Sequence, residues 1–204
     1  MKQRILIFLT LLLTASAAMT GADTADGLLA KAADRLRAAG SVTAQFTLAS
    51  GGGKASGRIV LAGERFHVST PDLSTWYDGR TQWTYSPKAR EVNITEPTPE
   101  ELQQVNPFAI INTFRRSYKA SFAGKTPTTR TVLLTPLSKN ADIKAVTVTL
   151  GTSTLYPTRI VINMADGQRL AIDVTKVTAG KAVPASTFTF NRRAYPGVEV
   201  VDLR

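Results

Sequence analysis

Residues 76–87 read WYDGRTQWTYSP and lie at the centre of the pattern that determines the fold. Asp78-Gly79 is a dipeptide typical of tight type I′ hairpin turns, and aromatic and polar residues alternate after it, over residues 82–86. Because side chains alternate between the two faces of a strand, Trp83 and Tyr85 share one face. We predict three neighbouring strands, over residues 74–78, 81–86 and 90–95. This segment therefore predicts an antiparallel sheet with aromatic side chains along one face.

The same two-residue alternation extends outward through most of the chain. Three further strands are predicted between residues 42 and 68, with Gly51-Gly52-Gly53 as a hairpin connection. Others are predicted between residues 117 and 190, with a two-residue hairpin turn at Asp166-Gly167 and a last strand over residues 188–190. About ten or eleven short strands, spaced roughly 8–12 residues apart, indicate one antiparallel sheet that is strongly curved or closed.

Helical periodicity is found in three places. Leu28, Leu29, Ala32, Ala33 and Leu36 recur at three- and four-residue spacing, which predicts an amphipathic helix over residues 25–39. It is capped by Asp23, Thr24 or Asp26 and ended by Gly40. A short helix is expected over Pro99–Gln104 and another one around Phe108, Ile111 and Phe114. The two short helices interrupt the run of strands, so we expect them to cover the sheet.

The N-terminus has the pattern of a secretory signal peptide. Lys2 and Arg4 precede an apolar run over residues 5–13, which small residues follow. The run is too short to cross a bilayer, which takes about 20 residues. We therefore predict a signal peptide over residues 1–17, a single mature domain over residues 18–204, and location in the periplasm of a bacterium. Loss of Lys2 and Arg4 lowers the formal net charge from +10 to +8.

Residue types that carry catalysis are scarce. The chain has no cysteine and a single histidine, His67, which argues against thiol chemistry, a serine–histidine triad and a histidine-rich metal centre. Residues 51–57 lack the spacing of a phosphate-binding loop, and Glu100-Glu101 suit the first turn of a helix. We expect no catalytic residue, no metal and no cofactor.

The distribution of charged and apolar residues along the chain also limits the classes of partner that we expect. Lys and Arg are scattered without long runs, so we expect no nucleic-acid partner. No second long apolar segment follows the N-terminus, so we expect no membrane span. We also expect the protein to be a monomer.

The remaining unusual feature is the amount of apolar surface on one curved sheet. Such a sheet either packs a filled core or encloses an apolar ligand beneath a helical cover. If it encloses a ligand, the predicted hydrophobic binding residues are Phe46, Leu48, Ile59, Leu61, Phe66, Val68, Trp76, Trp83, Tyr85, Val92, Ile94, Leu102, Phe108, Ile111, Val148, Ile160, Ile162 and Ile172.

Several motifs together resemble the outer-membrane lipoprotein carrier family (LolA-like). Residues 76–87 are similar to its D-G-x-T-x-W-x-Y-x-P strand pair, and residues 106–111 to its N-P-x-x-L/I lid helix. Further segments match in order: residues 34–46, Leu134-Thr135-Pro136, residues 188–190 and residues 198–202. The likeness extends over residues 28–204.

This resemblance implies a mainly β fold with helices. A single antiparallel sheet curls into an unclosed β-barrel, covered by a helical lid and an N-terminal helix. It also implies a periplasmic chaperone that takes acyl chains of lipoproteins from an inner-membrane transporter and passes them to an outer-membrane acceptor. Family members often hold the lid shut through an arginine on an early strand, for which Arg65 is the nearest candidate in a stretch that otherwise departs from the motif. The alternative is an envelope sensor, or another lipid carrier, that has the same fold and binds a partner protein.

Overall fold

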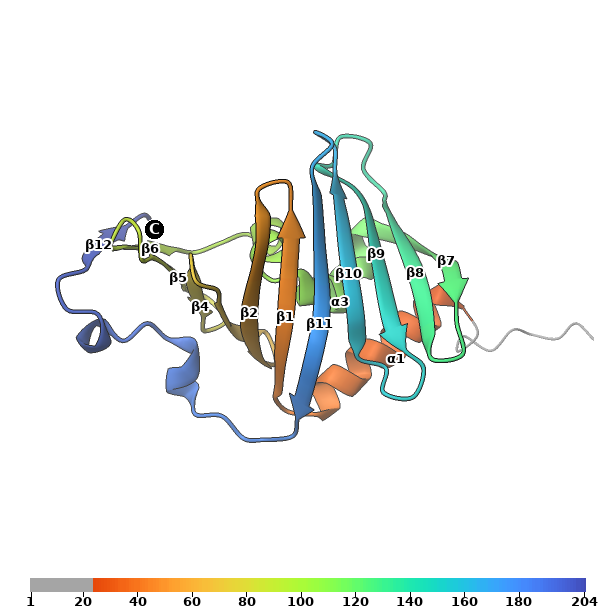
Figure 1. Cartoon of the computed structure of the whole chain (residues 1–204), viewed down its shortest axis with the longest axis horizontal. Coiled ribbons are helices and arrows are strands. Elements are labelled where there is room, and N and C mark those ends of the chain that lie inside the picture. Colours follow the sequence, from red (N-terminus) through yellow and green to blue (C-terminus); the bar gives the residue numbers. More distant parts are fainter. Residues whose placement is uncertain (1–23) are drawn as a thin grey trace, which may run out of the picture.

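The structure is a computed structural model that describes residues 24–204, so the predicted signal peptide lies outside the described residues. Twelve strands form one sheet in the order β12-β6-β5-β4-β3-β2-β1-β11-β10-β9-β8-β7. Every neighbouring pair is antiparallel except β12 with β6, which is parallel. The terminal strands β12 and β7 do not pair with each other, so the barrel is unclosed, as predicted (Figure 1). The strands are β1 (Val42–Ser50), β2 (Gly53–Ala62), β3 (Arg65–Ser69), β4 (Ser74–Tyr77), β5 (Gln82–Ser86), β6 (Glu91–Thr95), β7 (Tyr118–Lys125), β8 (Thr129–Pro136), β9 (Ile143–Gly151), β10 (Pro157–Met164), β11 (Arg169–Ala179) and β12 (Glu199–Asp202).

The longest helix, α1 (Ala25–Ala38), lies across one face of the sheet (Figure 1). Of the three candidate caps, Thr24 is used: its side chain accepts a hydrogen bond of 3.0 Å from the backbone N–H of Gly27. The predicted cover follows β6 as α2 (Pro99–Val105), the 3₁₀ turn η2 (Pro107–Ala109) and α3 (Ile110–Ser117). We call α2, η2 and α3 the lid.

The main core lies between the sheet and these helices. Ile110, Ile111 and Phe114 of α3 pack with Leu29 of α1 against the inward-facing side chains of the long strands. Over β1 and β11 to β8, the concave face of the sheet is therefore filled by helix side chains.

The opposite face of β2–β6 is covered by residues 180–198, here called the strap, which lead from β11 to β12 (Figure 1). The predicted strand over residues 188–190 is wrong. Phe188 ends a 3₁₀ turn, η3 (Ala185–Phe188), and its fully buried ring packs with Val60 and Ala62. Face packing against the sheet replaces strand pairing there. A second turn, η4 (Arg192–Ala194), follows before β12.

Two predicted hairpin turns differ from expectation. Asp78 N–H bonds to the carbonyl of Thr81 at 3.2 Å, so Gly79 and Arg80 form the tip of this hairpin. A type I′ turn is excluded because only the glycine has positive φ (+107°). The Asp78 carboxylate instead accepts hydrogen bonds of 2.9 Å from two backbone N–H groups, those of residues 80 and 81. At Asp166-Gly167, Met164 N–H bonds to the carbonyl of residue 168, which leaves a three-residue connection.

Candidate functional site

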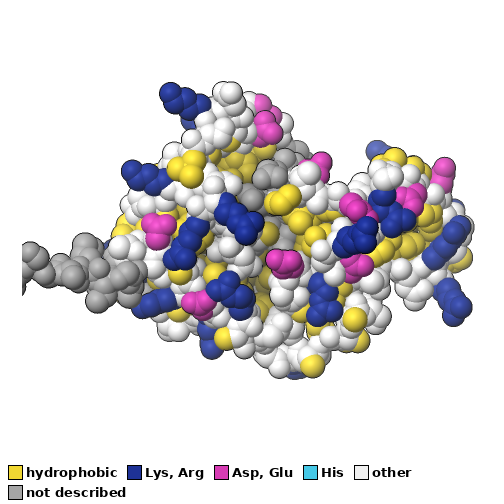
Figure 2. Space-filling view, turned by 180° about the vertical axis from the view of Figure 1, so that it is seen from behind, with side chains coloured by type: hydrophobic (Ala, Val, Ile, Leu, Met, Phe, Trp, Pro, Cys, Tyr) yellow, Lys and Arg dark blue, Asp and Glu magenta, His cyan; other side chains and the backbone are white. Residues whose placement is uncertain are grey.

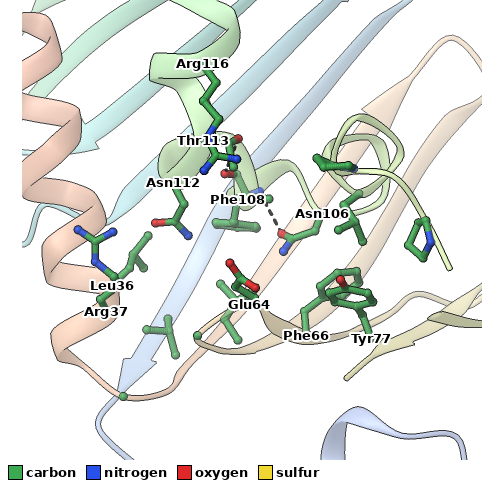
Figure 3. Close-up of a pocket in the computed structure, with 18 residues that line it drawn as sticks. Leu36, Arg37, Glu64, Phe66, Tyr77, Asn106, Phe108, Asn112, Thr113 and Arg116 are labelled. Atoms are coloured by element: carbon green, nitrogen blue, oxygen red, sulfur yellow. Dashed lines mark hydrogen bonds between the residues drawn. The ribbon is translucent and has the colours of Figure 1, made fainter. Parts of the chain in front are cut away.

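A pocket of about 260 Å³ opens where the lid, the end of α1 and strands β2–β4 meet (Figure 3). Its walls are mainly apolar and its mouth is polar. The lining residues are Leu36, Arg37, Gly40, Val42, Leu61, Gly63, Glu64, Phe66, Tyr77, Pro97, Pro99, Leu102, Asn106, Phe108, Ala109, Asn112, Thr113 and Arg116.

Two aromatic rings form the floor on the sheet side. Phe66 and Tyr77 face each other across β3 and β4, with ring centroids 5.3 Å apart and exposed fractions of 1% and 7%. Burial, followed by the charges of Glu64 and Asp78, raises the pKa of the Tyr77 hydroxyl. The floor therefore stays neutral and apolar through the physiological pH range.

The lid side is shaped by two capped helix starts. A capping box joins Thr98 and Glu101 at the start of α2: the Thr98 side chain accepts from Glu101 N–H, and the Glu101 carboxylate accepts from Thr98 N–H. The buried Asn106 side chain accepts a hydrogen bond of 3.1 Å from Phe108 N–H and so begins η2. This turn directs the Phe108 ring, which is 4% exposed, into the pocket (Figure 3).

Charged and polar groups gather at the mouth. Arg37 comes from the end of α1, Glu64 from the β2–β3 turn, and Asn112 and Arg116 from α3 (Figure 3). All four residues are exposed. The site is thus an apolar cavity with a charged entrance.

The predicted hydrophobic binding residues fall into three groups. Four of them line this pocket: Leu61, Phe66, Leu102 and Phe108. Nine lie on the same side of the sheet but in the packed core beneath α1 and α3: Phe46, Leu48, Ile59, Val68, Ile111, Val148, Ile160, Ile162 and Ile172.

The remaining five face the other side of the sheet. Trp76 pairs with Trp83 and stands on the face opposite its neighbour Tyr77; cross-strand pairing then puts Tyr85, Val92 and Ile94 on that same outer face. The structure therefore does not bring these five residues to the pocket.

An aromatic cluster on the outer face joins the strap to the sheet. Trp76 stacks on His67 at 4.8 Å between ring centroids and contacts Phe190 at 5.6 Å and Tyr195 at 5.8 Å. Tyr85 also contacts Tyr195, at 4.7 Å. These rings hold the strap in place.

Arg65, the candidate lid latch, also points to the outer face. Its guanidinium carbon lies 4.9 Å from the centroid of the Phe188 ring in η3, so this side chain contacts the strap rather than the lid. This position does not support the latch prediction for Arg65, which stays a prediction. The alternation of Arg65, Phe66 and His67 along β3 places the arginine on the face that the lid does not cover.

Sequence reasoning missed several lining residues. Tyr77 stands beside the more conspicuous Trp76, and the helical pattern assigns Leu36 only to the helix core. The two-residue period separates Tyr77 from Trp76, but it does not tell which face lies under the lid. The polar residues of the mouth have no motif that could reveal them.

Within residues 24–204, no cluster of three or more His, Asp or Glu side chains is arranged to hold a metal ion. None of the helices in that range has the length and apolar character needed to cross a membrane.

One known protein family matches most of the chain. The family described as "Outer membrane lipoprotein carrier protein LolA" matches residues 15–168. None of the curated proteins compared with the chain matches it.

Several solved structures are similar to this chain at low sequence identity. An uncharacterized conserved protein from Thermus thermophilus has a TM-score of 0.57 at 10% identity, over 85% of this chain and 98% of that one. A DUF1329 family protein from Desulfovibrio piger has a TM-score of 0.50 at 11% identity, over 84% and 97%. The complex of Pseudomonas aeruginosa MucA and MucB contains a chain with a TM-score of 0.48 at 17% identity, over 80% and 61%.

Proposed function

Because the chain belongs to the family of outer-membrane lipoprotein carrier proteins (LolA-like), we propose that it is a periplasmic chaperone. It holds acyl chains of lipoproteins in the lid pocket and carries them from an inner-membrane transporter to an outer-membrane acceptor. The observation that supports this proposal is the apolar pocket of about 260 Å³ beneath the lid. Its function is binding rather than catalysis.

The energetics suit a carrier. Transfer of each methylene from water to an apolar site is worth about 0.8 kcal/mol. At roughly 30 Å³ per methylene-sized group, a pocket of 260 Å³ accommodates roughly nine methylenes, worth about 7 kcal/mol before the cost of association. A longer acyl chain, or several acyl chains together, can bind only if the pocket widens.

The lid is built so that one part can move while the other stays. α3 is anchored, because Ile110, Ile111 and Phe114 are buried in the core beside α1. Among the described residues of α2 and η2, the hydrogen bonds join partners within residues 98–113. Outward movement of α2 therefore breaks mainly apolar contacts, which entering acyl chains replace. Such a segment supports two states of similar free energy, as loading and release require.

A binding experiment tests this function. A dye whose fluorescence rises in apolar surroundings is titrated into the mature protein, and lipid that copurifies from periplasm is identified by mass spectrometry. Leu102→Asp puts a charge inside the pocket and is expected to abolish dye binding, because an unpaired charge is costly to bury. Leu137→Asp is the matched control, since that leucine is 62% exposed and lies outside the pocket. No dye binding at micromolar protein, together with no copurified lipid, refutes the proposal.

One feature favours the alternative, a same-fold sensor or other carrier that binds a partner protein. Among the strands of residues 24–204, β7 ends the sheet and pairs with β8 alone, and Phe122 on it is 47% exposed. An open edge of this kind can accept an additional strand from another protein. Salt-dependent capture of an acidic envelope protein, without bound lipid, would favour this alternative.

A further inference from the structure

The mouth of the pocket carries more positive than negative charge. Arg37, Glu64 and Arg116 are its charged lining residues, two cations and one anion. In Figure 3, Arg116 and Asn112 extend from α3 toward the space into which Glu64 points from the β2–β3 turn. Figure 2 shows Lys and Arg side chains around exposed hydrophobic patches on the helix-covered face of the molecule. An apolar cavity thus opens directly beside a net positive rim.

On this basis we propose that the pocket takes an amphiphile with a single chain and an anionic head group, a carboxylate or a phosphate. The chain enters between Phe66 and Phe108, and the head group pairs with Arg116, assisted by Arg37. This inference rests on the proposed function, in that it assumes a chain in the lid pocket, and it adds the chemistry of the head group.

The position of Arg116 is not explained by the helix alone. Arg115 and Arg116 both stand in the last turn of α3, where a cation interacts favourably with the helix dipole. Arg115 lies over the Phe114 ring, with 5.8 Å from its guanidinium carbon to the ring centroid, and does not line the pocket. Arg116 lines the pocket, and no hydrogen bond or ion pair occupies its guanidinium among the described residues. Its donors are therefore available to a ligand, whose carboxylate or phosphate fits the planar guanidinium.

Arg37 is the weaker partner. It already forms an ion pair with Asp34 one turn earlier on α1, and both side chains are largely exposed. A head group at the mouth competes with Asp34 for this guanidinium. Because Asp34 offsets its charge, Arg37 contributes only where the head group displaces that carboxylate, while Arg116 provides the direct contact.

The effect of the Glu64 charge on affinity depends on the sign of the ligand charge. It lines the same mouth, so it repels an anionic head group and attracts a cationic one. Removal of its charge should strengthen the binding of an anion and weaken that of a cation. Neither effect is expected for a neutral ligand of the same length.

The size of the pocket limits the ligand to one chain in the closed state. Its volume of about 260 Å³ is below the range of about 300–1,000 Å³ that is usual for ligand sites, and matches roughly nine methylenes. Side-by-side chains do not fit unless α2 moves outward.

The experiment compares three ligands of equal chain length with the mature protein: dodecanoate, dodecyl phosphate and dodecanol, each measured by displacement of the dye. Arg116→Gln is expected to lower the affinity for both anionic ligands by about five- to tenfold. Glu64→Gln is expected to raise the affinity for them by about two- to threefold. Arg115→Gln, the matched control in the same helical turn, should change neither. The affinity for dodecanol should not change in any of the three variants. Added salt should lower the affinity for the two anionic ligands but not for dodecanol.

Other outcomes separate the two proposals. If dodecanol binds as tightly as the anions and Arg116→Gln behaves like Arg115→Gln, the head-group inference is refuted while chain binding stands. If inorganic phosphate alone displaces the dye as well as dodecyl phosphate does, the site is an anion site without need of a chain, which also refutes the inference. If neither the dye nor any of the three ligands binds to the folded protein, the proposed function itself is refuted.

Discussion

Two phenylalanines on the lid provide a direct test of which part of it borders the cavity. Phe108 and Phe114 are six residues apart and similarly buried, with exposed fractions of 4% and 2%. Both rings belong to the main buried cluster, but Phe108 also lines the pocket, whereas Phe114 does not. Replacement of each by alanine removes the same ring from these two different surroundings, so the consequences should differ.

The expected magnitudes follow from those surroundings. Phe114→Ala leaves a closed cavity in a filled core, which typically costs about 3–5 kcal/mol. Phe108→Ala enlarges a space that is already open, so only the transfer of the ring is lost, about 2 kcal/mol. For a domain of this size, each kcal/mol lowers Tm by about 2–4 °C. We expect a decrease in Tm of about 10 °C for Phe114→Ala and about 5 °C for Phe108→Ala.

The two variants should rank in the opposite order for dye binding, with the larger loss of affinity in Phe108→Ala. Phe108→Ala removes one wall of the pocket and is expected to weaken dye binding by about five- to tenfold, or ~1–1.4 kcal/mol. Phe114→Ala should bind the dye normally at temperatures well below its Tm. Circular dichroism gives the two Tm values and dye titration the two affinities. If Phe108→Ala binds normally, or if Phe114→Ala loses as much affinity while folded, then the assigned position of the cavity is wrong.

Three further predictions concern other parts of the sheet. A Cβ at Gly57 would lie 2.4 Å from Phe46 Cζ and 2.9 Å from the Ser69 carbonyl oxygen, so Gly57→Ala should cost about 1–3 kcal/mol in urea unfolding, and unchanged stability would contradict the described packing. Because Arg65 contacts the strap, Arg65→Gln should leave dye affinity unchanged and speed proteolysis of the strap, and a loss of affinity would support its role as a latch. Burial lowers the pKa of His67 in the folded protein, so the unfolded chain binds a proton more readily. The free energy of unfolding therefore falls as the pH drops below about 6.5. The difference in Tm between about pH 5 and about pH 8 should be smaller in His67→Phe than in the natural protein.

Much of the fold could be predicted from local patterns. The period of two identified β1 to β11, although it missed β12 and wrongly predicted a strand over residues 188–190. The three- and four-residue spacing identified α1 and the short helices of the lid. The details of turns were less accessible. Asp78 uses its carboxylate to accept hydrogen bonds from two backbone N–H groups, and only Gly79 has positive φ, so the turn is not of the type I′ that the dipeptide suggested.

The candidate site could be predicted only in part, because alternation assigns residues to two faces without saying what covers each face. Trp76 and Tyr77 illustrate this limit: adjacent in sequence and both buried, they belong to the strap side and the pocket side respectively. The most conspicuous aromatic residues turned out to hold the strap. The less conspicuous Tyr77 forms the floor of the pocket.

The sequence by itself determined most of the segments that become strands and helices, where the lid interrupts the sheet, and which family the chain resembles. These properties depend on neighbours a few residues apart, so they can be read from local spacing. Only the tertiary structure decided which face the lid covers, that the strap buries Trp76 on the other face, and that residues from α1, the β2–β3 turn and α3 form one charged mouth. Those outcomes depend on the packing of segments that are far apart in the chain, which no local period specifies.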